Sequence, residues 1–96
     1  MRKTKYTVKV TTQFRKDYKQ ATKRGLNMAL LDKVIEMLAL GTTLPEKYRD
    51  HALSGIWSGH RECHILPNWL LIYRKEEGFL VLILTRTGTH SDLFRK

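Results

Sequence analysis

The chain has 96 residues, 42% of them apolar, which is enough for one small domain with a single core. Its 18 Lys and Arg residues against 9 Asp and Glu residues give a formal net charge of +9 at pH 7, which favours a polyanionic partner such as nucleic acid, an acidic protein or an anionic membrane surface. The single cysteine excludes a disulfide framework and a cysteine-rich zinc module, and no apolar run approaches the roughly 18 residues of a membrane span. The basic start is not followed by the apolar segment of a signal peptide, so we expect a cytoplasmic protein.

The first 24 residues predict a strand followed by a basic helix. Residues 6–10 alternate apolar and polar side chains of β-favouring types, which is typical of a strand. Thr11 or Thr12 can then cap a helix that extends to about residue 24, where Gly25 ends it. Nine cations against one anion in residues 1–24 exceed what solubility requires, so contact with a phosphate backbone competes with a simple solvated face. The helical cations expected at a nucleic acid are Lys16, Lys19 and Lys23.

A second helix is predicted to run from a cap at Asn27 to about residue 40. Asn27 is a favourable N-cap, the apolar residues that follow recur at the spacing of a helix that faces a core, and Gly41 ends the segment. Residues 42–54 are then expected to form a loop, interrupted by Pro45.

The second half predicts three strands. They cover residues 56–65, 69–73 and 79–85, with a turn at residues 66–68 and a short irregular tail over residues 87–96. The near-continuous apolar run in the last strand is typical of a strand inside a sheet with both faces covered. We therefore expect one α+β domain over the whole chain, in which two helices pack on an antiparallel-rich sheet in the order β-α-α-β-β-β.

Three of the four histidines, His51, His64 and His90, lie where loops meet predicted strands, and a fold can aim such residues into one cleft. Imidazoles transfer protons near neutral pH. Several of them on a cationic domain with an arginine and aromatic residues favour RNA cleavage without a metal or other cofactor. In that reaction a base takes the ribose 2′-OH proton, the oxygen attacks the adjacent phosphate, an acid protonates the leaving 5′ oxygen, and cations stabilise the charge on phosphorus.

Plainer functions compete for the same residues, since a single histidine is more often structural than catalytic. His60 and His64 share one side of a strand with Glu62 and could chelate a metal, but no further ligand completes that site. Cys63 lies on the opposite side and is expected to be a small buried side chain. The aromatic residues that could stack on a base, or pack in the core instead, are Trp69 and Phe94.

An ordered set of residues in the second half resembles a known family. Its segments are Asp50–Gly55, Trp57, Arg61–Ile65, Pro67–Tyr73 and Arg86–Phe94. The set is similar to the YafQ-type toxins, which belong to the RelE/ParE superfamily of bacterial toxin–antitoxin systems. The β-α-α pattern of the first half also fits, so the resemblance covers nearly the whole chain, although only the second half is specific.

The resemblance implies a RelE-like fold and a ribosome-dependent endoribonuclease that cuts messenger RNA in the A site. It also implies a DinJ- or RelB-type antitoxin as partner, whose complex with the toxin binds operator DNA and represses its own operon. The ribosome and messenger, and not a membrane, would then be the anionic partners of the basic surface.

Carried over to this sequence, the resemblance implies catalytic roles for His51, His64 and His90. It further implies that Arg86 stabilises the phosphate and that Phe94 is the aromatic residue of the tail. Asn68 departs from the family pattern, in which an aspartate after the proline transfers or orients a proton, because an amide cannot accept a proton at useful pH. Either the histidines suffice, or the chain is a weakened form, or this branch has shifted function.

Two other functions remain open from the sequence. A ParE-like toxin poisons a protein target such as DNA gyrase, but that branch lacks this histidine set. A catalytically silent module that binds RNA or an antitoxin is favoured by Asn68. Cut messenger would separate the nuclease from both alternatives.

Overall fold

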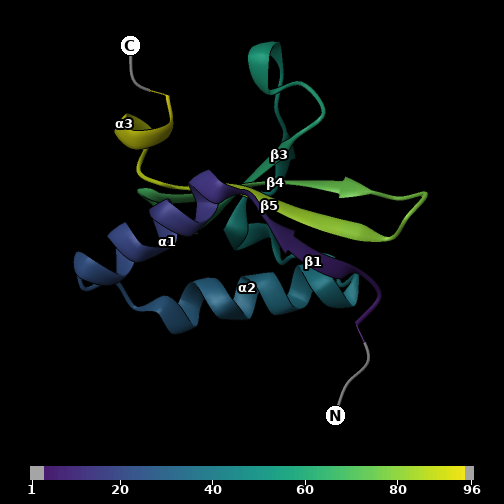
Figure 1. Cartoon of the computed structure of the whole chain (residues 1–96), viewed down its shortest axis with the longest axis horizontal. Helices are drawn as coiled ribbons and strands as arrows, with labels where there is room; N and C mark the ends of the chain where they lie inside the picture. Colours follow the sequence, from purple (N-terminus) through teal and green to yellow (C-terminus); the bar gives the residue numbers. More distant parts are fainter. Residues whose placement is uncertain (1–3, 95–96) are drawn as a thin grey trace.

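The computed structural model of the chain describes residues 4–94 (Figure 1). Residues 1–3 and 95–96, which include the first two cations of the basic segment and the end of the expected irregular tail, lie outside the described part. The elements in chain order are β1 (Thr7–Val10), α1 (Thr12–Lys23), α2 (Met28–Leu40), the 3₁₀ turn η1 (Glu46–Tyr48), β2 (His51–Ala52), the 3₁₀ turn η2 (Gly55–Trp57), β3 (Arg61–Leu66), β4 (Trp69–Glu76), β5 (Val81–Gly88) and α3 (His90–Leu93).

The five strands form one sheet in the order β1-β5-β4-β3-β2. The pair β1–β5 is parallel and the other three pairs are antiparallel, so the expected antiparallel-rich sheet is confirmed. In Figure 1, α1 and α2 lie on one face of this sheet, and α3 lies on the other with the loop that precedes β3.

The first half folds as its sequence predicts. Thr11 caps α1 by accepting a hydrogen bond from the Phe14 amide, and Asn27 caps α2 by accepting one from the Ala29 amide. Gly41 ends α2 with φ 82, in the left-handed region that glycine adopts without strain. Both predicted helices are therefore confirmed at both ends.

The segment before β3 differs from the prediction. The strand expected over residues 56–65 is wrong in its first half, because η2 occupies the start of that segment and the Ile56 side chain is 94% exposed. The strand begins only at Arg61. The loop expected over residues 42–54 contains η1 and the short strand β2, which pairs with β3.

The last strand and the tail also differ from the prediction. β5 begins two residues later than expected, because Phe79 and Leu80 form the turn after β4, with φ 52 at Leu80. The strand continues to Gly88, and Thr89 starts α3 where an irregular tail was expected. The cause is a capping box in which Thr89 and Asp92 bond to each other's backbone amides.

Two apolar clusters lie on the two faces of the sheet. The larger one packs α1 and α2 against side chains such as Leu71, Tyr73 and Leu82. The smaller one joins Leu70 and Ile72 of β4 to α3 and to the loop before β3. The apolar run of β5 belongs to an interior strand, as expected, because β5 lies between β1 and β4. Only Leu82 and Leu84 of that run are buried, so the expected cover of both faces of the strand is wrong. Within residues 4–94, no helix is long and apolar enough to cross a membrane.

Candidate active site

Three imidazoles from three different elements lie together, and we call them the histidine cluster: His51 of β2, His64 of β3 and His90 of α3. The ring centroids of His51 and His64 are 6.5 Å apart, and those of His64 and His90 are 6.0 Å apart. The ring of Phe94 continues the row at 6.2 Å from His90. The three imidazoles are therefore neighbours in space, while their shared cleft and their catalytic roles stay predictions.

Glu62 lies beside the histidine cluster, although the sequence indicated it only as a member of an incomplete metal site. It pairs directly with His51 across the strands β2 and β3, and it lies two residues before His64, on the same side of β3. Its Oε1 is 3.4 Å from His51 Nε2 and 3.7 Å from His64 Nε2, and the residue is only 5% exposed. A buried carboxylate thus faces two imidazoles, and strand alternation was the signal that could have found it.

The His51 ring is fixed on its other side by its own segment. Its Nδ1 is 2.7 Å from the carbonyl oxygen of Arg49, a residue with φ 50 that is unusual for a non-glycine. The neighbouring Asp50 carboxylate accepts hydrogen bonds from the Tyr73 hydroxyl and from Arg61 Nε. Burial, followed by this bond to Asp50, raises the pKa of Tyr73. These contacts hold β2 against the sheet and aim His51 Nε2 at Glu62.

Arg86, the predicted phosphate-stabilising residue, forms a two-point ion pair with α1. Its Nε donates to Asp17 Oδ2 at 2.9 Å and its Nη2 donates to Asp17 Oδ1 at 3.1 Å. The hydrogen bond to Asp17 raises the pKa of the guanidinium further above its ordinary value. The Asp17 carboxylate also accepts the Thr87 amide at 3.1 Å.

The short helix that carries His90 is held by a second ion pair from the C-terminal end of α1. Arg24 Nη1 donates to Asp92 Oδ2 at 2.8 Å, and the same oxygen accepts the Thr89 amide at 2.9 Å. These hydrogen bonds, the one from Arg24 first, hold the pKa of Asp92 well below its usual range. A Cβ at Gly88 would come within 2.9 Å of the Asp92 side chain, so this close approach of α3 to β5 requires glycine.

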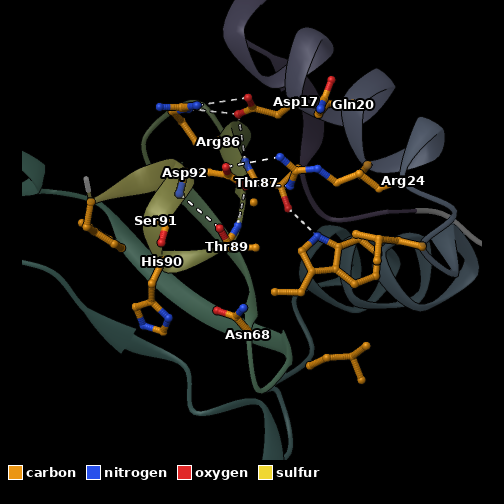
Figure 2. A pocket seen from close by; sticks show the side chains of 16 residues that line it. Asp17, Gln20, Arg24, Asn68, Arg86, Thr87, Thr89, His90, Ser91 and Asp92 are labelled. Carbon is orange, nitrogen blue, oxygen red and sulfur yellow. Dashed lines mark hydrogen bonds and ion pairs between the residues drawn. The ribbon is translucent and has the colours of Figure 1, made fainter. Parts of the chain in front are cut away.

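A hollow of about 1070 Å³ lies between α1 and the segment formed by the end of β5 and α3 (Figure 2). The predicted site residues that line it are Asn68, Trp69, Arg86, His90 and Phe94. His51 and His64 are not among its lining residues, so His90 is the member of the histidine cluster that reaches the hollow. In Figure 2, Arg86 extends toward Asp17 and the His90 ring extends the opposite way. The structure therefore gathers the imidazoles and places Arg86 on another side of the hollow.

The residues expected to bind nucleic acid fall into different environments. The prediction that Trp69 stacks on a base is wrong. The residue belongs to the core, because it is 3% exposed and its Nε1 donates to Thr87 Oγ1 at 3.0 Å. Phe94 is half-buried beside His90 and Trp57 and keeps part of its ring accessible. The predicted cations Lys16, Lys19 and Lys23 of α1 are exposed and lie outside the lining of the hollow, as does Arg15.

Cys63 and His60 are the residues on which the cysteine and metal alternatives depend. Cys63 is fully buried, as expected, and burial raises the pKa of its thiol to about 12, which does not suit a nucleophile. His60 packs edge-on against Trp57 at a centroid distance of 5.4 Å. In the part of the chain from residue 4 to residue 94, no group of three or more His, Cys, Asp or Glu side chains is arranged to hold a metal ion.

Comparisons with known proteins show which family the chain is similar to. Residues 6–95 match the family described as "Bacterial toxin of type II toxin-antitoxin system, YafQ". The mRNA interferase toxin YafQ of Escherichia coli K12 is 40% identical over 88 residues, which cover 91% of this chain and 94% of that protein. A crystal structure of the E. coli DinJ–YafQ complex matches with a TM-score of 0.86 at 38% identity, covering 93% of this chain and 98% of the other. A metal-bound toxin from Helicobacter pylori matches with a TM-score of 0.87 at 40% identity, covering 93% and 99%.

Proposed function

Because this chain belongs to the YafQ family of bacterial type II toxins, we propose that it is an endoribonuclease that cuts messenger RNA in the ribosomal A site. The observation that carries the proposal is the histidine cluster, in which three imidazoles and the carboxylate of Glu62 meet. Its member His90 lines the hollow that also holds Arg86. This combination supplies proton-transfer groups and a cation, which are what cleavage of RNA through its own 2′-OH requires.

The proposed reaction needs no metal. One imidazole takes the proton of the ribose 2′-OH, and the oxygen attacks the neighbouring phosphorus. A second, protonated imidazole gives its proton to the leaving 5′ oxygen, so the products are a 2′,3′-cyclic phosphate and a 5′-hydroxyl end. We assign one proton transfer to His90 and the other to the pair of His51 and His64, with Glu62 orienting that pair. Arg86 stabilises the charge that develops on the phosphate.

We expect the reaction to be slower with Asn68 than with the aspartate of the family pattern, but still to take place. It lies in the turn between β3 and β4 and lines the hollow with His90. Its amide can orient a neighbouring group by a hydrogen bond, but it cannot take a proton from one. The imidazoles then carry both proton transfers alone.

The proposed partners follow from the charge and from the relatives. A net charge of +9 suits ribosomal RNA and messenger, and it suits an acidic segment of an antitoxin. Because a related toxin forms a complex with DinJ, we expect a DinJ-like antitoxin to block the site. We also expect the toxin–antitoxin complex to bind operator DNA, and we place the activity in the cytoplasm with the ribosomes.

Primer extension on messenger from ribosomes incubated with the purified protein tests the proposal. We expect discrete truncated products, which disappear with the His64→Gln variant and with an added DinJ-like antitoxin. The His60→Gln variant is the matched control, since His60 is a histidine outside the cluster, and it should cut like the parent chain. Stalled ribosomes with uncut messenger would favour the silent binding module, and arrest of DNA replication with normal translation would favour a ParE-like toxin.

A further inference from the structure

The carboxylate of Asp17 is fully engaged at the edge of the hollow. Besides the two hydrogen bonds from Arg86 and the one from the Thr87 amide, its Oδ1 accepts Gln13 Nε2 at 3.0 Å. Four donors fill the acceptor positions of an ionised carboxylate. Two of these donors, Gln13 and the Thr87 amide, hold Asp17 independently of Arg86. The carboxylate is therefore a fixed point for the guanidinium and does not simply follow it.

The start of α1 is attached to the same part of β5. Thr11 Oγ1 donates to the carbonyl oxygen of Thr85 at 2.7 Å while the same side chain caps the helix. Thr85 is the extra residue of a β-bulge, because Ile72 pairs with Arg86 whereas Tyr73 pairs with Leu84. The bulge sets the direction of Arg86, and α1 contacts the backbone on both sides of that residue.

We propose that Asp17 is a positioning residue for Arg86, so that the guanidinium presents its free N–H groups to the phosphate of the substrate in one orientation. A guanidinium has five N–H donors, and Asp17 uses two of them, which leaves three for a phosphate. A cation held in place before charge develops needs no reorganisation during the reaction. This inference rests on the proposed function, because it gives Arg86 its role there.

Two other roles for the ion pair predict different results. If Asp17 were a latch that withholds Arg86 from the substrate, its removal would speed cleavage. If Asp17 only joined α1 to β5, its removal would lower stability and activity to the same extent whether or not Arg86 is present. A positioning role instead requires that the effect of Asp17 on the rate vanish when Arg86 is absent.

The test is a double-mutant cycle with Asp17→Asn, Arg86→Ala and the double variant, by single-turnover cleavage of messenger on saturating ribosomes. The amide introduced by Asp17→Asn has one acceptor oxygen and one donor group, so it cannot accept the two Arg86 bonds at separate oxygens as the carboxylate does. We expect Asp17→Asn to slow cleavage about tenfold in the parent chain and to change it less than about twofold in the Arg86→Ala chain. Asp32→Asn is the matched control, because Asp32 is a carboxylate of α2 that accepts a hydrogen bond from the Tyr18 hydroxyl of α1, and it should leave the rate unchanged.

A second measurement does not depend on activity. In the parent chain the Nε–H of Arg86 should give a sharp, slowly exchanging NMR signal, which broadens with Asp17→Asn and stays sharp with Asp32→Asn. Faster cleavage by Asp17→Asn, equal slowing in both backgrounds, or an unchanged Arg86 signal would each overturn the positioning role. Failure of the parent chain to cut messenger would instead contradict the proposed function.

Discussion

On one side of the hollow Arg86 is fixed by two hydrogen bonds to Asp17, whereas the histidine cluster is held by ring contacts, one carboxylate and one carbonyl oxygen. The Arg86 side chain is 24% exposed, and the side chains of His51 and His64 are 50% and 19% exposed. The two regions therefore differ in how their side chains are held, and this difference fits their proposed tasks. A cation that stabilises a developing charge has to be in place beforehand, while a group that gains and loses protons needs access to substrate and solvent.

The strongest test of proton transfer by the histidine cluster is the loss of His90, the member of the cluster that lines the hollow. Glutamine keeps a similar size but cannot transfer a proton, so we expect His90→Gln to slow cleavage by about 10²–10⁴. The pH–rate profile should lose one of its limbs. His60→Gln is the control, and a variant profile that keeps both limbs would remove His90 from proton transfer.

A variant of Glu62 tests whether the activity of His51 and His64 depends on the carboxylate that faces them. Glu62→Gln keeps the shape of the side chain but removes the charge that faces His51 and His64. We expect single-turnover cleavage to slow about tenfold, because the rings lose the negative charge that faces and orients them. Glu46→Gln, on the exposed start of η1, is the control for loss of one negative charge. Equal rates for both variants would exclude an orienting role for Glu62.

A variant of Asn68 should raise the cleavage rate, whereas the two variants above should lower it, because it places a carboxylate at this position. We expect Asn68→Asp to raise the single-turnover rate several-fold, because the new carboxylate can accept a proton or orient an imidazolium. The residue is exposed in a turn, so the fold should tolerate the change. No gain in rate would remove proton transfer from this position and would leave the histidines as its only carriers.

The ion pair between Arg24 and Asp92 is more exposed than the one at Arg86, with side-chain exposures of 40% and 31%. We expect Asp92→Asn to lower the free energy of unfolding by about 1 kcal/mol at pH 7, mainly through the weakened capping box. The hydrogen bonds from Arg24 and Thr89 lower the pKa of Asp92 in the fold, so its contribution is present above its ordinary value of 3.8 and is lost as the pH falls below it. Urea unfolding of both chains at pH 7 and pH 3 measures this, and a difference that does not shrink at pH 3 would contradict it.

The parts that the sequence predicted best are those with local signals. Thr11, Asn27 and Gly41 mark helix ends by their own chemistry, and the structure confirms all three. The bulge at Thr85 and the ion pair between Asp17 and Arg86 depend on strand register and on contacts 69 residues apart, which no local pattern encodes. Apolar residues that are exposed in turns, such as Ile56, imitate a strand in the sequence because hydropathy alone does not reveal what packs on them.

The chemical ends of the cut messenger test the account most directly. RNA recovered from ribosomes treated with the parent chain should carry a 2′,3′-cyclic phosphate on the upstream fragment and a 5′-hydroxyl on the downstream fragment, since the 2′-OH is the attacking group. Fragments with a 5′-phosphate, or messenger that stays intact on stalled ribosomes, would contradict cleavage by the histidine cluster.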